Sequence, residues 1–423
     1  MKGKIPLATP LKYEHIKNAL AGTAAAFRCR RRLQPAGGAG DKVFPPTFAG
    51  AVYAIEQRRV PGRDAPVTCV LLDSVQSQAN RMELALQEAV DAGKIQLPLI
   101  EVDFSEYDPT GDVEADQKAG RMIDAVGKIT SLQAPHRLAD AILRDSELDG
   151  VEFRKSETGG ALNTASLAHA TPLFELCPTA LLFGMWDSTG PKGGLGPKFE
   201  RSVVSEIVGI GAEVGDLLRG VRRDPLEIRA AVKVKKNTNG SWEVADPKAK
   251  GVVAPSEINH SSVPYPKKRD QKTEDNYYAG ATIEYAEQAT TLSLIGLRRL
   301  RFPVNGQTNE NTGQAARAVL AALGLCAATL AFEFGVGLRS RSLLWPEGQM
   351  VWELLERPGS APRIFELDGE QSVALLNEAI GAAKDAGLPW REDPVVLKPS
   401  NKLLELVRLS QLQETKDSVD RES

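Results

Sequence analysis

The sequence is short of cysteine, histidine and aromatic residues, and each shortage excludes a class of protein. Its 423 residues include four cysteines and four histidines, and aromatic residues make up 6%. The cysteines stand alone at positions 29, 69, 177 and 326, without the CxxC spacing of a zinc site or the density of a disulfide-rich secreted protein. We therefore expect no metal site, and reduced thiols in a cytosol.

Signals for export and for membrane insertion are lacking too. Residues 1–6, MKGKIP, contain no apolar signal core. The longest nearly uncharged run, Ala318 to Phe332, is too short to cross a bilayer and is predicted to be a helix buried in the protein core. The sequence therefore predicts a cytoplasmic protein that does not bind a membrane.

Motifs of common enzyme families are absent. There is no HExxH or GxSxG, and the Gly-rich loop at 190–196 is not a P-loop because Phe199, rather than Ser or Thr, follows Lys198. Asp73 and Asp187 each follow a predicted strand, but no second carboxylate lies near either in sequence to complete a metal pair. These absences favour a binding protein without a cofactor over an enzyme.

Two histidines keep one enzymatic alternative open. His136 and His260 lie in polar sequence, where they can serve as general acid and base in metal-independent RNA cleavage. A lone histidine is more often a hydrogen-bonding or phosphate-contacting group, so binding is the preferred interpretation.

Charge is balanced over the chain but unevenly placed. The formal charge is −3, from 52 basic and 55 acidic residues, so the protein has no overall basic field for a nucleic acid. Seven acids and no base lie between Glu101 and Asp116, in a loop expected to be flexible and to face away from a polyanion. Basic residues instead form short clusters, which favour binding of a nucleic-acid backbone over reading of bases. The clusters are Arg28 with Arg30, Arg31 and Arg32; Arg222 and Arg223; Lys233, Lys235 and Lys236; Lys267, Lys268 and Arg269; Arg298, Arg299 and Arg301; and Arg339 with Arg341.

The stretch from Val67 to Ala92 organises the chain. The apolar run 67–72 predicts a buried strand, and apolar residues at helical spacing after it predict a helix capped by Asp73 or Ser74. Free backbone N–H groups and polar side chains at such a helix start are suited to holding phosphates. These side chains are Ser74, Gln76, Ser77, Gln78 and Arg81. The alternatives are a well-capped surface helix and a small-molecule site on the same strand, turn and helix.

Further elements follow from periodicity and turn signals. We expect helices at 12–27, 131–146, 314–332 and 370–386, strands at 96–102, 179–186, 336–344 and 351–355, and a basic, then Gly-rich, loop at 28–41. Residues 228–245 predict a hairpin around an Asn239–Gly240 turn, with Trp242 on an apolar face and Lys233 and Lys235 on the other. Such a hairpin either packs on its own domain or wedges between bases.

Seven sequence blocks resemble a known family. They are LLDSVQSQANRME (71–83), TSLQAPHRLADAILRDSELDG (130–150), ATPLFELCPTALLFGMWDS (170–188), KFERSVVSEIVG (198–209), PSEINH (255–260), LRRLRF (297–302) and LRSRSLL (338–344). In order and over nearly the whole chain, they are similar to the RAMP-superfamily backbone subunit of type I-U (also called I-G) CRISPR effector complexes, or Cascade. Residues 74–81 also resemble the guide-contacting helix start of Cascade backbone subunits generally.

The resemblance implies an α+β fold, with an RRM-like (ferredoxin-like) palm, large insertions and a protruding thumb hairpin. Residues 1–423 would form a single domain. Its insertions would be the acidic loop at about 103–120 and the thumb with its adjoining loop at about 225–280, and a flexible tail would follow at about 411–423.

The resemblance also implies a structural, non-enzymatic role in antiviral defence. Several copies would form a helical filament along a CRISPR RNA (crRNA) and present the guide for pairing with target DNA, beside other Cascade subunits and a recruited helicase-nuclease. The alternative function is a RAMP-type, metal-independent RNA-processing endonuclease. The predicted RNA contacts are Ser74, Gln76, Ser77, Gln78, Arg81, His136, Arg137, Lys192, Lys198, Arg201, Arg298, Arg299, Arg339 and Arg341, and the predicted thumb residues are Lys233, Lys235 and Trp242.

Overall fold

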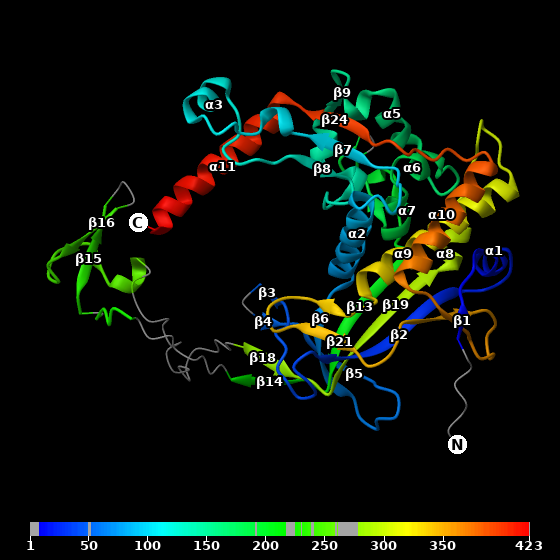
Figure 1. Ribbon diagram of the computed structural model, residues 1–423, viewed down its shortest axis with the longest axis horizontal. Coiled ribbons are helices and arrows are strands. Elements are labelled where there is room, and N and C mark those ends of the chain that lie inside the picture. Colours follow the sequence, from blue (N-terminus) through cyan, green and yellow to red (C-terminus); the bar gives the residue numbers. More distant parts are fainter. Residues whose placement is uncertain are drawn as a thin grey trace. The chain divides into compact units, whose positions relative to one another are not determined.

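The computed structural model describes residues 8–49, 52–190, 193–216, 225–229, 231–237, 241–258, 260 and 278–422 (Figure 1). It confirms a mixed α+β fold with several sheets. The chain groups into two compact units. Unit 1 comprises residues 1–104, 128–215 and 280–400, and unit 2 comprises residues 105–127, 216–279 and 401–423.

Unit 1 is built on a large, mostly antiparallel sheet. Its strands follow one another in the order β1–β23–β22–β2–β19–β13–β6–β5, and β21, itself paired with β20, also pairs with β2. Only β1 and β23 run parallel. The strands are β1 (Thr9–Pro10), β23 (Arg363–Glu366), β22 (Val351–Leu355), β2 (Ala26–Pro35), β19 (Tyr285–Ser293), β13 (Val203–Ile210), β6 (Val67–Asp73), β5 (Ile55–Arg58), β20 (Val336–Gly337) and β21 (Leu343–Pro346).

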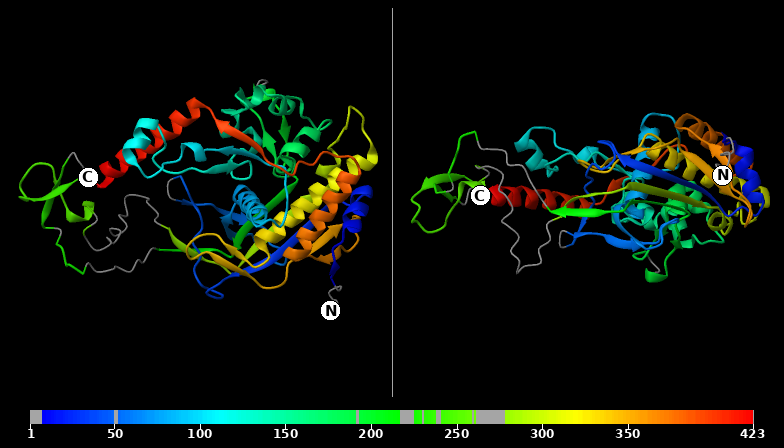
Figure 2. Two further views of the ribbon diagram at one scale, coloured as in Figure 1. Left: turned by 45° about the horizontal axis from the view of Figure 1, so that its top comes forward. Right: turned by 90° about the horizontal axis from the view of Figure 1, so that it is seen from below.

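Helices cover one face of this sheet. The central helix α9 (Glu310–Phe332) packs against α1 (Tyr13–Ala21), α2 (Val75–Asp91) and α10 (Gly369–Asp385), and α9 and α10 lie side by side along the sheet (Figures 1 and 2). By length and composition alone α9 could cross a membrane, but 89% of its apolar window is buried inside the fold. The predicted core helix is thereby confirmed.

The opposite face of the sheet carries paired charges. Arg28 bonds Glu353 at 2.6 Å and Arg30 bonds Glu287 at 2.8 Å. Both arginines belong to β2, so the expected loop at 28–41 is wrong for its first part. The arginines alternate with buried Phe27, which is the period-two pattern of a strand.

A second, five-stranded sheet of unit 1 has the order β10–β9–β24–β7–β8. It contains β10 (Val151–Glu152), β9 (Ser146–Leu148), β24 (Val395–Pro399), β7 (Ile100–Asp103) and β8 (Lys128–Thr130). The remaining elements of this unit are short, and those labelled η are 3₁₀ helices. They are β3 (Thr47–Phe48), β4 (Val52–Tyr53), η2 (Arg137–Ala139), α4 (Ala141–Arg144), η3 (Phe153–Lys155), α5 (Glu157–Gly160), η4 (Ala161–Thr164), α6 (Thr171–Leu176), α7 (Pro178–Phe183), β11 (Met185–Trp186), η5 (Gly193–Leu195), β12 (Lys198–Phe199) and α8 (Leu294–Arg298).

Three further predictions for this unit are wrong. The expected helix at 131–146 is a turn followed by η2 and α4, because Arg137 adopts a left-handed conformation (φ 51°) that a helix does not contain. The expected strand at 179–186 is mostly α7, because Pro178 starts a helix and a continuous apolar run does not distinguish the two structures. The expected strand at 336–344 is the β20–β21 hairpin, whose turn contains Arg341 at φ 58°.

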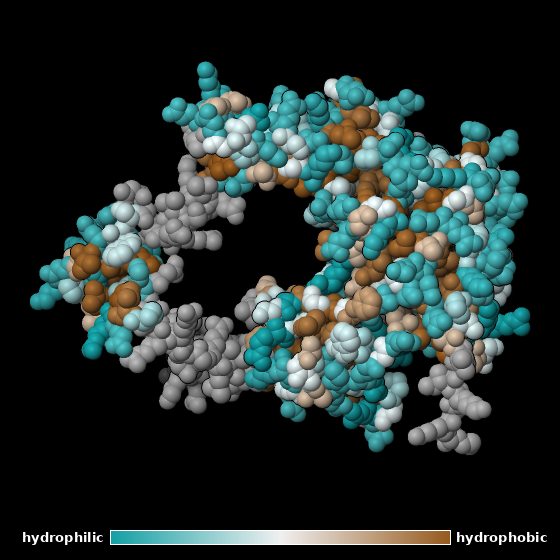
Figure 3. Space-filling view, in the orientation of Figure 1, coloured by the Kyte–Doolittle hydropathy of each residue, from teal (hydrophilic) through white to brown (hydrophobic). Residues whose placement is uncertain are grey.

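Unit 2 contains elements from three parts of the sequence. They are η1 (Ser105–Tyr107), α3 (Val113–Ala119), β15 (Lys233–Lys236), β16 (Trp242–Ala245), β17 (Val252–Val253), η6 (Pro255–Ile258) and α11 (Asn401–Glu422), while β14 (Glu213–Asp216) pairs with β18 (Tyr278–Thr282) where the insertion begins and ends. The acidic segment thus contains a helix, and so does the tail. The predicted hairpin is confirmed in β15 and β16, while its Asn239–Gly240 turn lies outside the described residues. Figure 3 shows apolar side chains gathered on this hairpin, where Val244 is 73% exposed.

Candidate nucleic-acid interface

Three of the predicted cations line one groove on unit 1. Lys198, Arg201 and Arg299 surround a hollow of about 400 Å³ together with Ser202, Ser293 and the acidic Glu200. Arg299 lies about a hundred residues from the other two, so folding rather than sequence proximity brings the cations together. A groove that combines cations with hydroxyl donors can bind the phosphates of a single strand.

Backbone pairing joins the two segments of this groove. The N–H of Ser293 donates to the carbonyl of Ser202 at 2.7 Å, which places the start of α8 beside the start of β13. The side chain of Ser293 then caps α8 by accepting from the N–H of Gly296 at 3.0 Å. The groove is therefore fixed by the main chain of the large sheet.

The cations differ in how far the protein already satisfies them. Arg299 forms an exposed ion pair with Glu200 at 3.0 Å, and Arg201 donates to the carbonyl of Phe183 at 3.1 Å. Burial, with the charge of Arg137 nearby, lowers the pKa of Arg201, yet a guanidinium remains protonated at neutral pH. Among the described residues, Lys198 and Arg201 form no ion pair with a carboxylate. Their charge is available to a ligand.

Arg137 is buried and acts as a support for the groove. Its guanidinium donates to both carboxylate oxygens of Glu83, at 2.5 and 2.7 Å, and to the carbonyl of Gly184 at 3.0 Å. Burial raises the pKa of Glu83, and Arg137 opposes that rise. Through these bonds Arg137 ties α2 to the turn before β11. His136, next in sequence, is exposed and free to face a ligand.

The start of α2 contains fewer accessible groups than the sequence suggests. Ser74 caps the helix as predicted, accepting from the N–H of Ser77 at 3.3 Å. Gln78 is fully buried: its amide oxygen accepts from Ser205 at 2.7 Å and from Gln288 at 2.9 Å. The exposed Gln76 and half-buried Ser77 remain at the surface.

Asp73 holds the predicted phosphate ligand Arg81. Its buried carboxylate accepts from Nε of Arg81 at 3.0 Å and from the amide of Gln78 at 2.6 Å. The other guanidinium nitrogens of Arg81 donate to the carbonyls of Gly337 and Leu338, at 3.0 and 3.2 Å. Arg81 thus fastens the β20–β21 turn to α2.

The β20–β21 turn brings two more predicted residues to the start of α2. Arg339 donates to the carbonyl of Phe44 at 2.7 Å, and burial lowers its pKa. Arg341 is exposed, lies over the ring of Phe44 at 5.4 Å, and is 3.5 Å from Asp41. The structure thereby assembles a second polar cluster from the α2 start and this turn.

The last predicted residues are dispersed. Arg298 donates to the carbonyls of Ala19, Leu20 and Ala24 and so binds the end of α1. Lys192 lies outside the described residues. On the hairpin of unit 2, Lys233 is half-buried and Lys235 exposed, and Trp242 packs edge-on against His260 at 5.6 Å.

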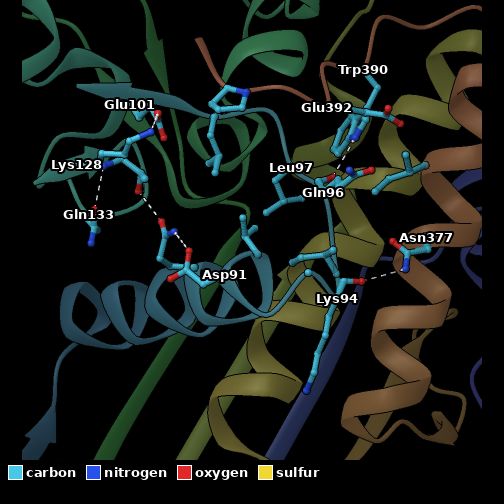
Figure 4. A pocket seen from close by; sticks show the side chains of 18 of the residues that line it. Asp91, Lys94, Gln96, Leu97, Glu101, Lys128, Gln133, Asn377, Trp390 and Glu392 are labelled. Atoms are coloured by element: carbon cyan, nitrogen blue, oxygen red, sulfur yellow. Dashed lines mark hydrogen bonds and ion pairs between the residues drawn. The ribbon is translucent and has the colours of Figure 1, made fainter. Parts of the chain in front are cut away.

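A larger cleft of about 800 Å³ elsewhere in unit 1 has a different character (Figure 4). Its Lys128 is paired with Glu101 at 2.7 Å, and Trp390 donates to the carbonyl of Gln96 at 3.2 Å. None of the predicted RNA contacts lines it. Across the described residues no three metal-ligating side chains form a cluster, so a metal centre has no candidate there.

One surface residue beside the groove escaped the sequence analysis. Trp186 is 53% exposed and pairs in register with Lys198, whose ammonium nitrogen lies 5.0 Å from the ring centroid. The sequence predicts that this tryptophan is buried, because it ends the apolar run 179–186. Its position just before a basic, Gly-rich loop was the available signal.

The fold and this groove define a class: an α+β protein with a cationic surface groove beside an aromatic side chain. Residues 27–214, less than half of the chain, match the family model described as CRISPR-associated protein GSU0053. Over these residues the chain is similar to that family, which agrees with the predicted relationship to type I-U CRISPR backbone subunits.

The other comparisons add little. The crystal structure of Thermofilum pendens Csc2 aligns with 96% of this chain and 90% of its own, at 10% sequence identity and a TM-score of 0.25, a likeness too low to support an argument. No curated protein matches the chain.

Proposed function

We propose that this protein is a structural, RNA-binding backbone subunit of a type I-U CRISPR effector complex. The observation that carries the proposal is the groove in which Lys198, Arg201 and Arg299 converge. In a chain of net charge −3, such a gathering of cations is not a consequence of overall composition. A CRISPR-associated family and a phosphate-binding groove together favour a guide RNA as the ligand.

The strand order of the large sheet supports an RRM-like palm. The four strands β22–β2–β19–β13 are neighbours and all antiparallel, and in chain order they read 4-1-3-2, the arrangement of a ferredoxin-like sheet. Helices α2 and α9 fall in the two helical positions of that motif. Ion pairs of Arg28 and Arg30 occupy the open face of this sheet on β2, so RNA would bind at loops and helix ends.

The remaining parts of the proposal follow from the family. The hairpin at 233–245, with Lys233, Lys235 and Trp242, serves as the thumb, and its exposed apolar face supports a role in contact with bases or neighbouring subunits. Copies of the chain assemble along the crRNA in the cytoplasm with other Cascade subunits. Target DNA is recognised by pairing with the guide, and a recruited helicase-nuclease cuts it.

Hydrogen bonding inside the fold separates some of the predicted contacts from those at the surface. The side chains of Gln78, Arg137 and Arg298 form hydrogen bonds with other groups of the fold. We propose that they position the site without touching RNA. The groove cations form the primary contact. The surface groups that extend it are Gln76, Ser77, His136 and Arg341.

Replacing the groove cations should weaken RNA binding in a salt-dependent way. We expect the triple variant Lys198→Gln, Arg201→Gln, Arg299→Gln to bind single-stranded RNA on the order of 100-fold more weakly at low salt, because phosphate contacts are lost. The slope of log affinity against log salt should become shallower by about 0.7 for each lost contact. Filter binding over a series of salt concentrations measures both.

A matched control lies in the other cleft. Lys94→Gln removes an exposed lysine that lines the 800 Å³ cleft, and it should leave affinity and slope unchanged. Equal binding by the triple variant and the wild type would refute the proposed site. Cleavage of precursor RNA by purified protein, lost on His136→Ala or His260→Ala, would favour the endonuclease alternative.

A further inference from the structure

Trp186 is held in an exposed position by the fold around it. It follows Gly184, whose left-handed conformation (φ 84°) ends α7 and turns the chain into β11. Arg201 bonds the carbonyl of Phe183, and Arg137 bonds that of Gly184, so two guanidinium groups fix this turn. The indole is therefore presented on a rigid element, although half of its area remains in water.

The surroundings of Trp186 are cationic. Lys198 lies over its ring and also lines the groove with Arg201 and Arg299, and the one acidic residue among the described residues that line this groove, Glu200, is paired with Arg299. An aromatic surface next to a row of cations is the arrangement that binds a single strand, because phosphates follow the cations while a base stacks on the ring.

Another tryptophan shows that exposure alone does not produce this arrangement. Trp345 is 58% exposed, but it shares its cleft with the acidic side chains of Glu333, Glu347 and Glu366. Those carboxylates repel phosphate, so Trp345 is a poor place for a nucleic acid. Trp186 differs from it in charge environment and matches it in exposure.

We propose that Trp186 is a stacking platform for one base of the single strand whose phosphates occupy the groove. The proposal rests on the RNA-binding function above and adds the residue that contacts a base. Stacking tolerates any base, because every base has a π-face. It would fix the register of the strand at this point without adding sequence preference.

The test compares a strand with bases to one without. Trp186→Ala should weaken binding of an oligouridine RNA on the order of tenfold, since one stacked base is lost, while the salt slope stays that of the wild type. Binding of an abasic ribose-phosphate oligomer of equal length should not change. Trp186→Phe should retain most of the affinity, and Trp345→Ala should behave as wild type. Circular dichroism melting verifies that each variant is folded.

The outcomes separate this inference from the proposed function. If Trp186→Ala binds RNA normally while the triple groove variant does not, stacking is wrong and the groove stands. If Trp186→Ala weakens the abasic oligomer as much as the RNA, the tryptophan acts through Lys198, and stacking is again wrong. If neither the tryptophan nor the triple variant changes binding, both proposals fail.

Discussion

At the scale of single residues, the ion pair of Arg137 and Glu83 is buried, whereas the pairs on the open face of the large sheet are partly exposed. The side chains of the buried pair are 9% and 4% exposed, so each charge has lost most of its hydration. Removing one partner would leave the other charged and unsolvated, which is far more costly than breaking a pair in water. The same pair also holds the turn that precedes Trp186.

Arg137→Ala should therefore destabilise the fold by about 3–5 kcal/mol. Arg30→Ala, which breaks the exposed pair with Glu287, should cost about 1 kcal/mol or less. Urea unfolding of both variants measures the difference. The double variant Arg137→Met, Glu83→Leu should recover most of the loss, because no unpaired charge remains buried. Equal stabilities of Arg137→Ala and Arg30→Ala would contradict the support role.

Individual residues were predicted unevenly, for a physical reason. The capping role of Ser74 depends on neighbours within one turn, and the sequence contains all of them. The burial of Gln78 depends on Ser205 and Gln288, which lie far away in the chain and arrive only through sheet pairing. Local chemistry can be anticipated from sequence, whereas the partners of a side chain across the core cannot.

At the scale of elements, two glycines show how closely α9 approaches the sheet. A Cβ added at Gly324 of α9 would lie 2.9 Å from a methyl of Val203 and 3.1 Å from one of Leu182. A Cβ added at Gly381 of α10 would meet nothing within 4 Å. A glycine is therefore closely packed in α9 and has open space beside it in α10.

The same substitution should have opposite effects in these helices. Gly324→Ala is expected to destabilise the fold by about 1–3 kcal/mol, because the added methyl overpacks the contact with β13. Gly381→Ala should stabilise it by about 0.5–1 kcal/mol through the helix propensity of alanine. Denaturation midpoints of the two variants test this. A stabilising Gly324→Ala would show that α9 does not pack closely against β13.

The sequence predicts an element correctly where its hydrophobic periodicity and its helix cap indicate the same structure. The prediction fails where charged residues obscure the periodicity. Helix α2 has an amphipathic pattern and a serine cap, and α9 has a long apolar run, so both were recognised. Strand β2 was mistaken for a loop because its arginines outweighed the alternating Phe27, Cys29 and Leu33. In 131–146 the helical pattern is interrupted at Arg137, which has a left-handed backbone conformation and a buried ion pair with the distant Glu83.

At the scale of the whole molecule, the large sheet draws on distant parts of the chain. Strand β2 pairs with β19, whose residues follow some 250 positions later, and β22 comes from later still. The order of these strands cannot be obtained from periodicity, and the resemblance to a known family supplied the expected palm. The groove cations are likewise assembled only after this pairing.

If copies of the subunit assemble along the guide, the size of the assembly should depend on RNA. Protein coexpressed with a CRISPR RNA should elute as a large species with a raised ratio of absorbance at 260 to 280 nm. Ribonuclease treatment should reduce this species to single chains, because one RNA strand links the copies. Size-exclusion chromatography before and after treatment measures this, with a nuclease specific for double-stranded DNA as the control. A monomer free of nucleic acid before treatment would contradict assembly on RNA.

The open face of the large sheet matters for how this protein responds to its ionic surroundings. Arg28 and Arg30 are each matched by a glutamate on an adjacent strand, while Arg32 on the same face lies over the ring of Tyr285 at 4.2 Å. Raising the salt concentration screens both members of each pair alike, so the two pairs contribute no net charge at any ionic strength. The two pairs themselves would therefore neither attract nor repel a long polyanion passing this face.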